Sequence, residues 1–330
     1  MADDDIPNND KRAAPAGAKD RVTSNARGAL VDAWQATLRS FAFALAADDF
    51  EGAWRERLMK SAHRIRELTA QEPDAALYMM LQTATHEVDS YSASHSMFCA
   101  VVADLCATYF EWPEAEADAI RGAALTMNVG MLLMQNSMAL QAEPLSAAQK
   151  LRVQEHPAKS VELLQKAGLD DPLWLEIVRR HHRPIDDGES SDPLTPAQRL
   201  AQLLQRIDVF TAKLSRRKTR PGSTATIAAR DACLDASGLP DATGATMLRV
   251  LGLFPPGSFV RLANGEVGVV IRRGEKAHTP VVAAVRRSDG TSIPTPIVRR
   301  TAERPYLVQR SLSADDVKMR LDHQRIVAAG

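Results

Sequence analysis

The sequence contains few cysteines and few aromatic residues. Its 330 residues include three cysteines, and aromatic residues make up 5% of the chain. Cysteines so few and so scattered exclude a disulfide framework, and no cluster has zinc-finger spacing. Cys99 and Cys106 stand seven residues apart in a stretch with a helical pattern, so we expect both to pack in a core.

Net charge and long apolar runs are also missing. Lys plus Arg and Asp plus Glu each number 41, so no global field draws the chain to nucleic acid or to a membrane surface. No apolar run reaches the roughly 18–20 residues that span a bilayer. The opening MADDDIPNNDKR has no hydrophobic signal region. We therefore expect a cytoplasmic protein without membrane or nucleic-acid partners.

Hydrophobic residues at three- and four-residue steps dominate the chain from residue 29 to about 251, which predicts helices. Breaks are expected at 112–113, 143–144, 168–170 and 183–194. Thr195 followed by Pro196 is typical of an N-cap with proline at the first helical position. The charged residues from about Ala314 to Val327 predict a closing helix.

The periodicity changes after FPPG at 254–257. Two β-rich runs flank Asn264-Gly265, a strong hairpin signal, and a third run leads to Asp289-Gly290. The expected fold class is mainly α, with a small antiparallel β subdomain after the helical bundle. The expected parts are a disordered tail (1–28), an N-terminal helical region (29–74), the main helical domain (75–252), the β subdomain (253–312) and a C-terminal helix (313–330).

Several histidines and one aspartate occur in informative settings. In chain order they are His95 on a helix, His156 before Pro157, the pair His181-His182 at a helix end, and Asp208 within a helix. A lone helical histidine is usually an ordinary core or surface residue, and a lone aspartate is often a cap. Their order along the chain favours one shared site.

With these motifs the sequence resembles an HD-GYP domain, a helical branch of the HD phosphohydrolase superfamily, over roughly residues 75 to 240. His95 matches the first helix histidine of that family, and the other matches are the His-Pro motif, the His-His pair and the aspartate of DVxDA. Arg217 and Arg220 match the family's phosphate-facing arginines. The resemblance implies two or three metal ions, usually iron or manganese, and hydrolysis of cyclic di-GMP.

The motif that names the superfamily is degenerate here. Met127 and Asn128 stand in place of His-Asp, Gly130 is retained, and Met131 replaces a lysine. The GYP region, which falls at about 184–191, is also lost, and Thr211 replaces the second aspartate of DVxDA. A neutral amide bridges two metals poorly, and a thioether is a soft ligand that suits iron(II), manganese or magnesium badly. A two-metal hydrolase needs both ions close together, so this loss puts the activity in doubt.

Part of the implied site persists. His156, His181 and His182 could hold one divalent metal such as iron, manganese or zinc, and His95 with Asp208 is the remnant of a second half-site. Asp208 is also the candidate to orient or deprotonate water. Two interpretations stay open: bound metal, or relic histidines that are hydrogen-bonded in a helical core with no metal.

Three functions remain open. The first is a degenerate, impaired or inactive HD-GYP-type pseudoenzyme in bacterial cyclic di-GMP signalling. It would bind the nucleotide through Arg217 and Arg220, or a partner such as a diguanylate cyclase. The alternative is an active metal-dependent phosphodiesterase with a rebuilt site, and the third is a helical scaffold. Whether the chain is an enzyme is left undecided by the sequence.

Overall fold

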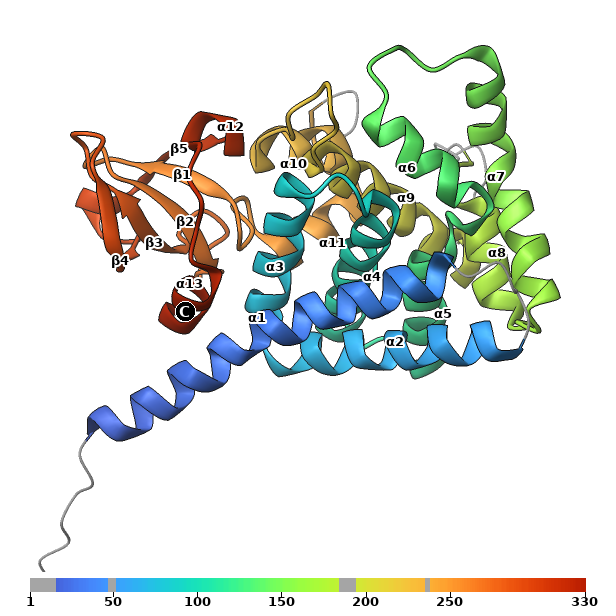
Figure 1. Cartoon of the computed structure of the whole chain (residues 1–330), viewed down its shortest axis with the longest axis horizontal. Helices are drawn as coiled ribbons and strands as arrows, with labels where there is room; N and C mark the ends of the chain where they lie inside the picture. Colours follow the sequence, from blue (N-terminus) through green and yellow to red (C-terminus); the bar gives the residue numbers. More distant parts are fainter. Residues whose placement is uncertain (1–15, 47–51, 184–193, 235–237) are drawn as a thin grey trace, which may run out of the picture.

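The chain is mainly α-helical and carries a small antiparallel sheet near its C-terminus, which confirms the expected fold class (Figure 1). The computed structural model describes residues 16–46, 52–183, 194–234 and 238–330, with side chains from Arg27 onward. The main helices are α1 (Ala16–Ala46), α2 (Gly52–Gln71), α3 (Pro73–His86), α4 (Tyr91–Tyr109), α5 (Glu114–Thr126), α6 (Leu132–Leu140), α7 (Ala147–Lys166), α8 (Pro172–Arg180), α9 (Pro196–Leu214), α10 (Ala225–Cys233) and α11 (Ala242–Leu251).

Both ends of the chain differ from expectation. Helix α1 already begins at Ala16, inside the stretch 1–28 expected as a disordered tail, because a nucleated helix extends at little cost. Residues 1–15 lie outside the described residues. The expected single C-terminal helix is two short ones, α12 (Ala314–Val317) and α13 (His323–Ala329). Lys318 ends α12 in the left-handed region at φ 46°, and a helix cannot continue through that conformation.

The sheet has the strand order β4-β3-β2-β1-β5. Its strands are β1 (Phe259–Leu262), β2 (Val267–Arg272), β3 (Val281–Arg286), β4 (Ser292–Arg300) and β5 (Val308–Leu312). The turns fall where the sequence predicts them. Gly265 between β1 and β2 and Gly290 between β3 and β4 have φ of 86° and 87°, values that glycine adopts without strain.

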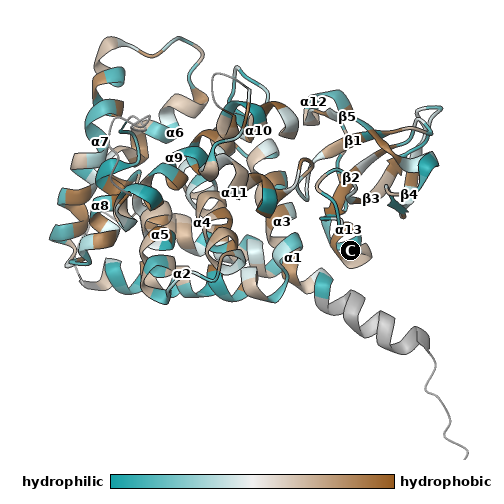
Figure 2. Cartoon of the chain, turned by 180° about the vertical axis from the view of Figure 1, so that it is seen from behind, coloured by the Kyte–Doolittle hydropathy of each residue, from teal (hydrophilic) through white to brown (hydrophobic). Residues whose placement is uncertain are grey.

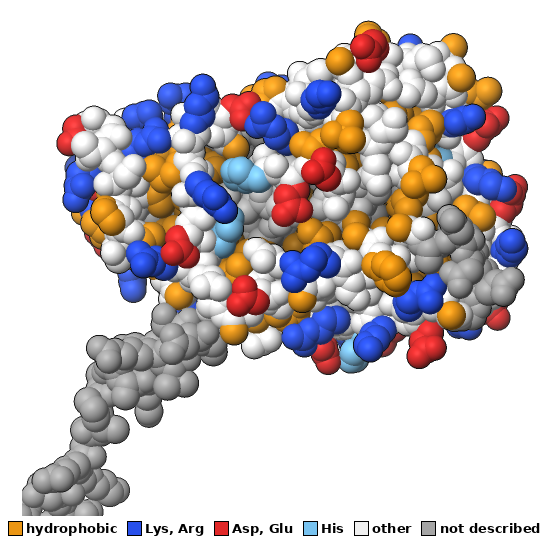
Figure 3. Space-filling view, in the orientation of Figure 1, with side chains coloured by type: hydrophobic (Ala, Val, Ile, Leu, Met, Phe, Trp, Pro, Cys, Tyr) orange, Lys and Arg blue, Asp and Glu red, His pale blue; other side chains and the backbone are white. Residues whose placement is uncertain are grey.

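Helices and sheet share one hydrophobic core. A single cluster of buried side chains runs from Leu30 on α1 to Val327 on α13 and includes Phe259 and Val269 of the sheet. Hydropathy alternates around the helices, with hydrophobic faces turned inward (Figure 2). Charged side chains of both signs are scattered over the surface, as in Figure 3. Among the described residues, no helix is both long and apolar enough to cross a bilayer.

Five helices and one turn position the histidine and aspartate motifs. Helices α4, α5 and α9 contact one another, α8 packs against α7 and α9, and the 3-10 turn η1 (Val129–Met131) packs on α7. The starts of α7 and α9 are fixed by capping boxes in which Ser146 and Thr195 each accept a backbone N–H three residues on. The predicted N-cap at Thr195 is thereby confirmed.

Candidate metal centre

His156 and His181 face each other across the contact between α7 and α8. The Nε2 atoms of the two rings are 3.1 Å apart. Each Nδ1 lies 2.7 Å from a backbone carbonyl three residues earlier, that of Val153 for His156 and that of Val178 for His181. A carbonyl oxygen only accepts, so both Nδ1 atoms donate a proton. In the neutral rings, both Nε2 atoms therefore present lone pairs.

The local sequence explains why these carbonyls are available. Pro157 lies inside α7 and has no N–H, so it cannot donate to the carbonyl of Val153 four residues earlier. That carbonyl is left for His156. Val178 lies in the last turn of α8, where carbonyls lose their helical donors. The His-Pro motif and the His-His pair at a helix end thus each orient one imidazole.

This arrangement fits a metal ion. Burial and the nearby His182 lower the pKa of His156 to about 4 and that of His181 to about 3, so both rings are neutral at ordinary pH. Two neutral lone pairs at 3.1 Å repel unless a cation lies between them. The exposed His182 also offers a ring nitrogen, and the three ligand atoms lie within 4.8 Å of one another. Three imidazoles suit zinc or iron(II).

A second cluster joins α4 and α9. His95 Nε2 lies 2.7 Å from Asp208 Oδ1 and 3.7 Å from Cys99 Sγ. Burial alone would lower the pKa of His95, but Cys99 and the hydrogen bond to Asp208 raise it well above its usual range. Burial raises the pKa of Asp208, but His95 outweighs this effect and lowers it overall. Without metal, His95 and Asp208 therefore form an imidazolium–carboxylate pair.

The two clusters interact with each other electrostatically. The charge of Asp208 raises the pKa of both His156 and His181, against the larger effect of burial. Conversely, His181 and His182 help to lower the pKa of Asp208. Cys99 is buried in the core, as the sequence predicts, but its place in this cluster was not predicted. Its spacing of four residues from His95 on one helix was the available signal, because such residues share a face.

The degenerate turn is fastened to α7 beside His156. The Ser160 hydroxyl donates to the carbonyl of Met127 at 2.7 Å and accepts from the N–H of Gly130 at 2.9 Å. Ser160 stands one turn after His156, on the same face of α7. Asn128 is 2% exposed, and within the described residues neither its Oδ1 nor its Nδ2 has a hydrogen-bond partner. A neutral amide without a hydrogen-bond partner among the described residues is thus buried in this turn.

Of the two predicted phosphate-facing arginines, one lies beside the second cluster. The Arg217 guanidinium sits 5.6 Å from the centre of the Tyr91 ring, and Tyr91 stacks on His95 with ring centres 5.7 Å apart. Arg220 is exposed and donates to the carbonyl of Ala212 at 3.0 Å. Burial and the charge of Arg217 both lower the pKa of Arg220. Within the described residues neither arginine has a carboxylate partner, which leaves both charges available to an anion.

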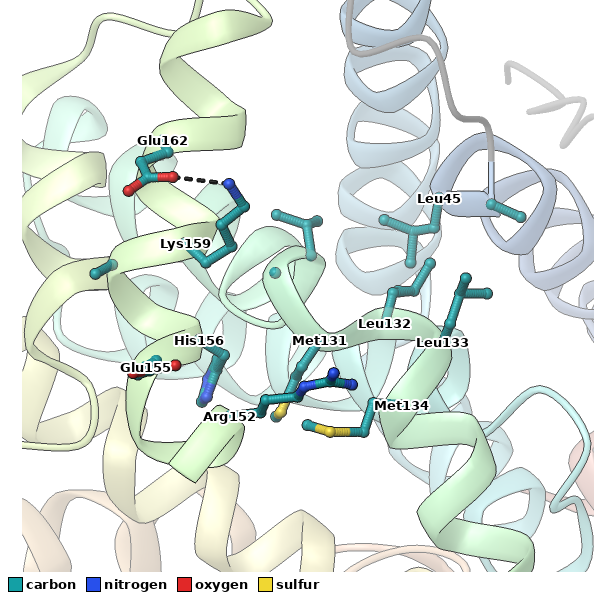
Figure 4. Close-up of a pocket in the computed structure, with 14 residues that line it drawn as sticks. Leu45, Met131, Leu132, Leu133, Met134, Arg152, Glu155, His156, Lys159 and Glu162 are labelled. Atoms are coloured by element: carbon teal, nitrogen blue, oxygen red, sulfur yellow. Dashed lines mark hydrogen bonds and ion pairs between the residues drawn. The ribbon is translucent and has the colours of Figure 1, made fainter. Parts of the chain in front are cut away.

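A cavity of about 700 Å³ opens on the other side of the turn, between α6, α7 and the end of α1 (Figure 4). His156 and Met131 line it together with Arg152. In Figure 4 the guanidinium of Arg152 lies beside Met131 and Met134, and no ion pair of Arg152 occurs among the described residues. Lys159 is instead paired with Glu162 at 2.8 Å. The stretch 184–191, where the resemblance predicts the GYP region, lies outside the described residues.

Comparison with known proteins supports the resemblance to HD-GYP domains. The chain is 25% identical over 259 residues to a curated protein of Pseudomonas aeruginosa named cyclic di-GMP phosphodiesterase PA4108. The aligned part is 75% of this chain and 61% of that relative, so the chain spans well short of the relative's whole length. No family model matches the sequence. No solved structure matches it either.

Proposed function

We propose that this chain is an HD-GYP-type protein of cyclic di-GMP signalling that binds the nucleotide at a metal-loaded pocket and hydrolyses it poorly or not at all. The observation that carries this proposal is the contrast within one pocket. Both ligand clusters are complete enough to hold a cation. Asn128 lies in the sequence between the motifs that supply the two clusters. Its neutral side-chain amide has no hydrogen-bond partner among the described residues.

The chain's own residues can perform the binding part. His156, His181 and His182 would hold one ion, and His95 with Asp208 would contribute to a second. A bound ion would supply electrostatic attraction for a phosphate oxygen and would acidify water. Arg217 would add a charge-assisted contact from its place above Tyr91. Arg152 would supply positive charge near Met131, where the family has a lysine.

Hydrolysis is the weaker part. Two-metal phosphodiester cleavage needs both ions held roughly 3.5–4 Å apart, so that one holds the attacking oxygen and the other the leaving oxygen. A bridging carboxylate fixes that separation and offsets charge, and Asn128 can do neither. The second candidate function, an active phosphodiesterase with a rebuilt site, is favoured by the survival of both clusters, with Asp208 left to orient water.

One set of measurements on the purified full chain separates these functions. We expect bound transition metal, cyclic di-GMP binding by calorimetry and no turnover. Arg217→Ala should weaken binding by tenfold or more, because a hydrogen bond to a charged group contributes about 1.5–3 kcal/mol. Arg216→Ala is the matched control, since the Arg216 side chain pairs with Asp315 instead.

Three other outcomes would decide against the proposal or part of it. Turnover that disappears in His181→Ala would establish the active phosphodiesterase. Absence of both metal and nucleotide binding would refute the proposal. Equal affinities of wild type and Arg217→Ala would remove Arg217 from the binding site.

A further inference from the structure

Three different donor atoms converge at the second cluster. Cys99 stands one helical turn after His95 on α4, and Asp208 reaches the same point from α9. Cys99 and His95 are 0% and 1% exposed, and the side chain of Asp208 is 16% exposed. All three ligand atoms lie within 4.8 Å of one another. A buried thiol, imidazole and carboxylate in this arrangement can surround one cation.

The distances match a tetrahedral site. Zn–S and Zn–N bonds of about 2.3 and 2.0–2.1 Å place sulfur and nitrogen roughly 3.5–3.6 Å apart on a tetrahedral edge. The observed separation of Cys99 Sγ and His95 Nε2 is 3.7 Å. His95 Nε2 and Asp208 Oδ1, now 2.7 Å apart through a hydrogen bond, need to separate by only about 0.7 Å to reach their own edge length.

We infer that Cys99, His95 and Asp208 form a thiolate-containing metal site, with Cys99 as the ligand that sets its metal preference. Cation binding needs a thiolate at Cys99 and a free lone pair at His95 Nε2. His95 keeps its Nδ1 proton, which faces the Thr211 hydroxyl at 3.4 Å. The sulfur also has Thr211 Oγ1 at 3.1 Å as a neighbour.

The donor set selects the class of metal. A thiolate favours soft and borderline ions such as zinc, iron(II) or cobalt(II) and disfavours magnesium, calcium and manganese. The thiolate and the carboxylate together offset the charge of a divalent ion in a buried place, where an uncompensated charge is costly. The other cluster offers three imidazoles and no sulfur. The two clusters therefore differ in their donor atoms, and of the two only the cluster of Cys99, His95 and Asp208 can bind a metal through sulfur.

The site deepens the proposed function, because it rests on the same metal-binding pocket, but its test needs no nucleotide. The metal-free full chain is titrated with cobalt(II) and followed by near-ultraviolet absorption. We expect a thiolate-to-cobalt charge-transfer band in the wild type that is lost in Cys99→Ser. Cys106→Ser is the matched control and should keep the band, since Cys106 is equally buried on the same helix.

A second measurement avoids any variant that fails to fold. Zinc-edge X-ray absorption of the zinc-loaded wild type should show a sulfur neighbour at about 2.3 Å. No charge-transfer band at cobalt saturation, a band that survives in Cys99→Ser, or a zinc shell of nitrogen and oxygen alone would each overturn the inference. Sulfur ligation without cyclic di-GMP binding would instead refute the nucleotide function and leave this site standing.

Discussion

Gly130 is the one member of the degenerate turn that matches the family motif, and its surroundings give a packing reason for it. A Cβ added at Gly130 would lie 2.8 Å from the carbonyl oxygen of His156 and 2.8 Å from the amide nitrogen of Ser160. Real Cβ atoms do not approach that closely, and both opposing atoms belong to the backbone of α7. Gly130→Ala must therefore push the turn away from α7.

The cost can be bounded from these contacts. Overpacking of a well-packed interior typically costs about 1–3 kcal/mol, and two backbone clashes without a flexible side chain to yield place this variant near 2 kcal/mol or above. The displacement also strains the hydrogen bond from the Gly130 N–H to Ser160. Since His156 belongs to the same turn of α7, metal affinity should fall together with stability.

Urea unfolding of the metal-free protein measures the first effect, and a cobalt titration measures the second. Gly28→Ala is the control, because the added Cβ at Gly28 meets only Gln324 Cβ at 4.0 Å. It should stabilise the protein by about 0.5–1 kcal/mol, as glycine-to-alanine changes inside helices do. A Gly130→Ala protein as stable as the wild type, with unchanged cobalt affinity, would show that the turn is not held against α7 as described.

Two further substitutions and one control test the packing that supports the site. Arg121→Met should destabilise the protein by about 3–5 kcal/mol in thermal or chemical unfolding, because it leaves the carboxylate of Asp104 buried without its partner. Arg64→Ala, which breaks the exposed pair with Glu67, should change the stability far less, and equal losses would contradict the assignment. Thr195→Ala removes the cap of α9 and should cost about 1 kcal/mol, whereas a neutral result would show that the capping box contributes nothing.

Local signals predicted most of the fold. The predicted helix breaks at 112–113, 143–144 and 168–170 all lie between described helices, and both hairpin turns lie at Asn-Gly and Asp-Gly. The break between α3 and α4, at 87–90, contains neither proline nor glycine and was not predicted. The C-terminal interruption at Lys318 was not predictable in this way. Arg286 of the sheet donates to the carbonyl of Val317 at 2.7 Å, so a tertiary contact stands at the end of α12.

The sequence predicted those residues of the site that belong to short local motifs. The His-Pro and His-His motifs can be interpreted from one sequence alone. The proline and the helix end each leave a helix carbonyl without its helical donor, and that carbonyl orients an imidazole. Which side chains from distant segments meet is not local information. In the sequence Cys99 has the pattern of a core residue, and only the fold shows that α9 brings Asp208 and Thr211 against it. Arg217 and Arg220 look equivalent in sequence, yet only Arg217 stacks on Tyr91.

Charge counting shows why the loss of the HD aspartate favours binding over turnover under the proposed function. Two divalent ions bring four positive charges, and the described clusters offer two negative ones, from Asp208 and a Cys99 thiolate. The two phosphodiesters of cyclic di-GMP supply the other two, so the intact nucleotide neutralises a buried pocket in which excess charge is costly. An aspartate at position 128 would supply one of those negative charges itself and lower the demand for ligand charge, which Asn128 cannot do.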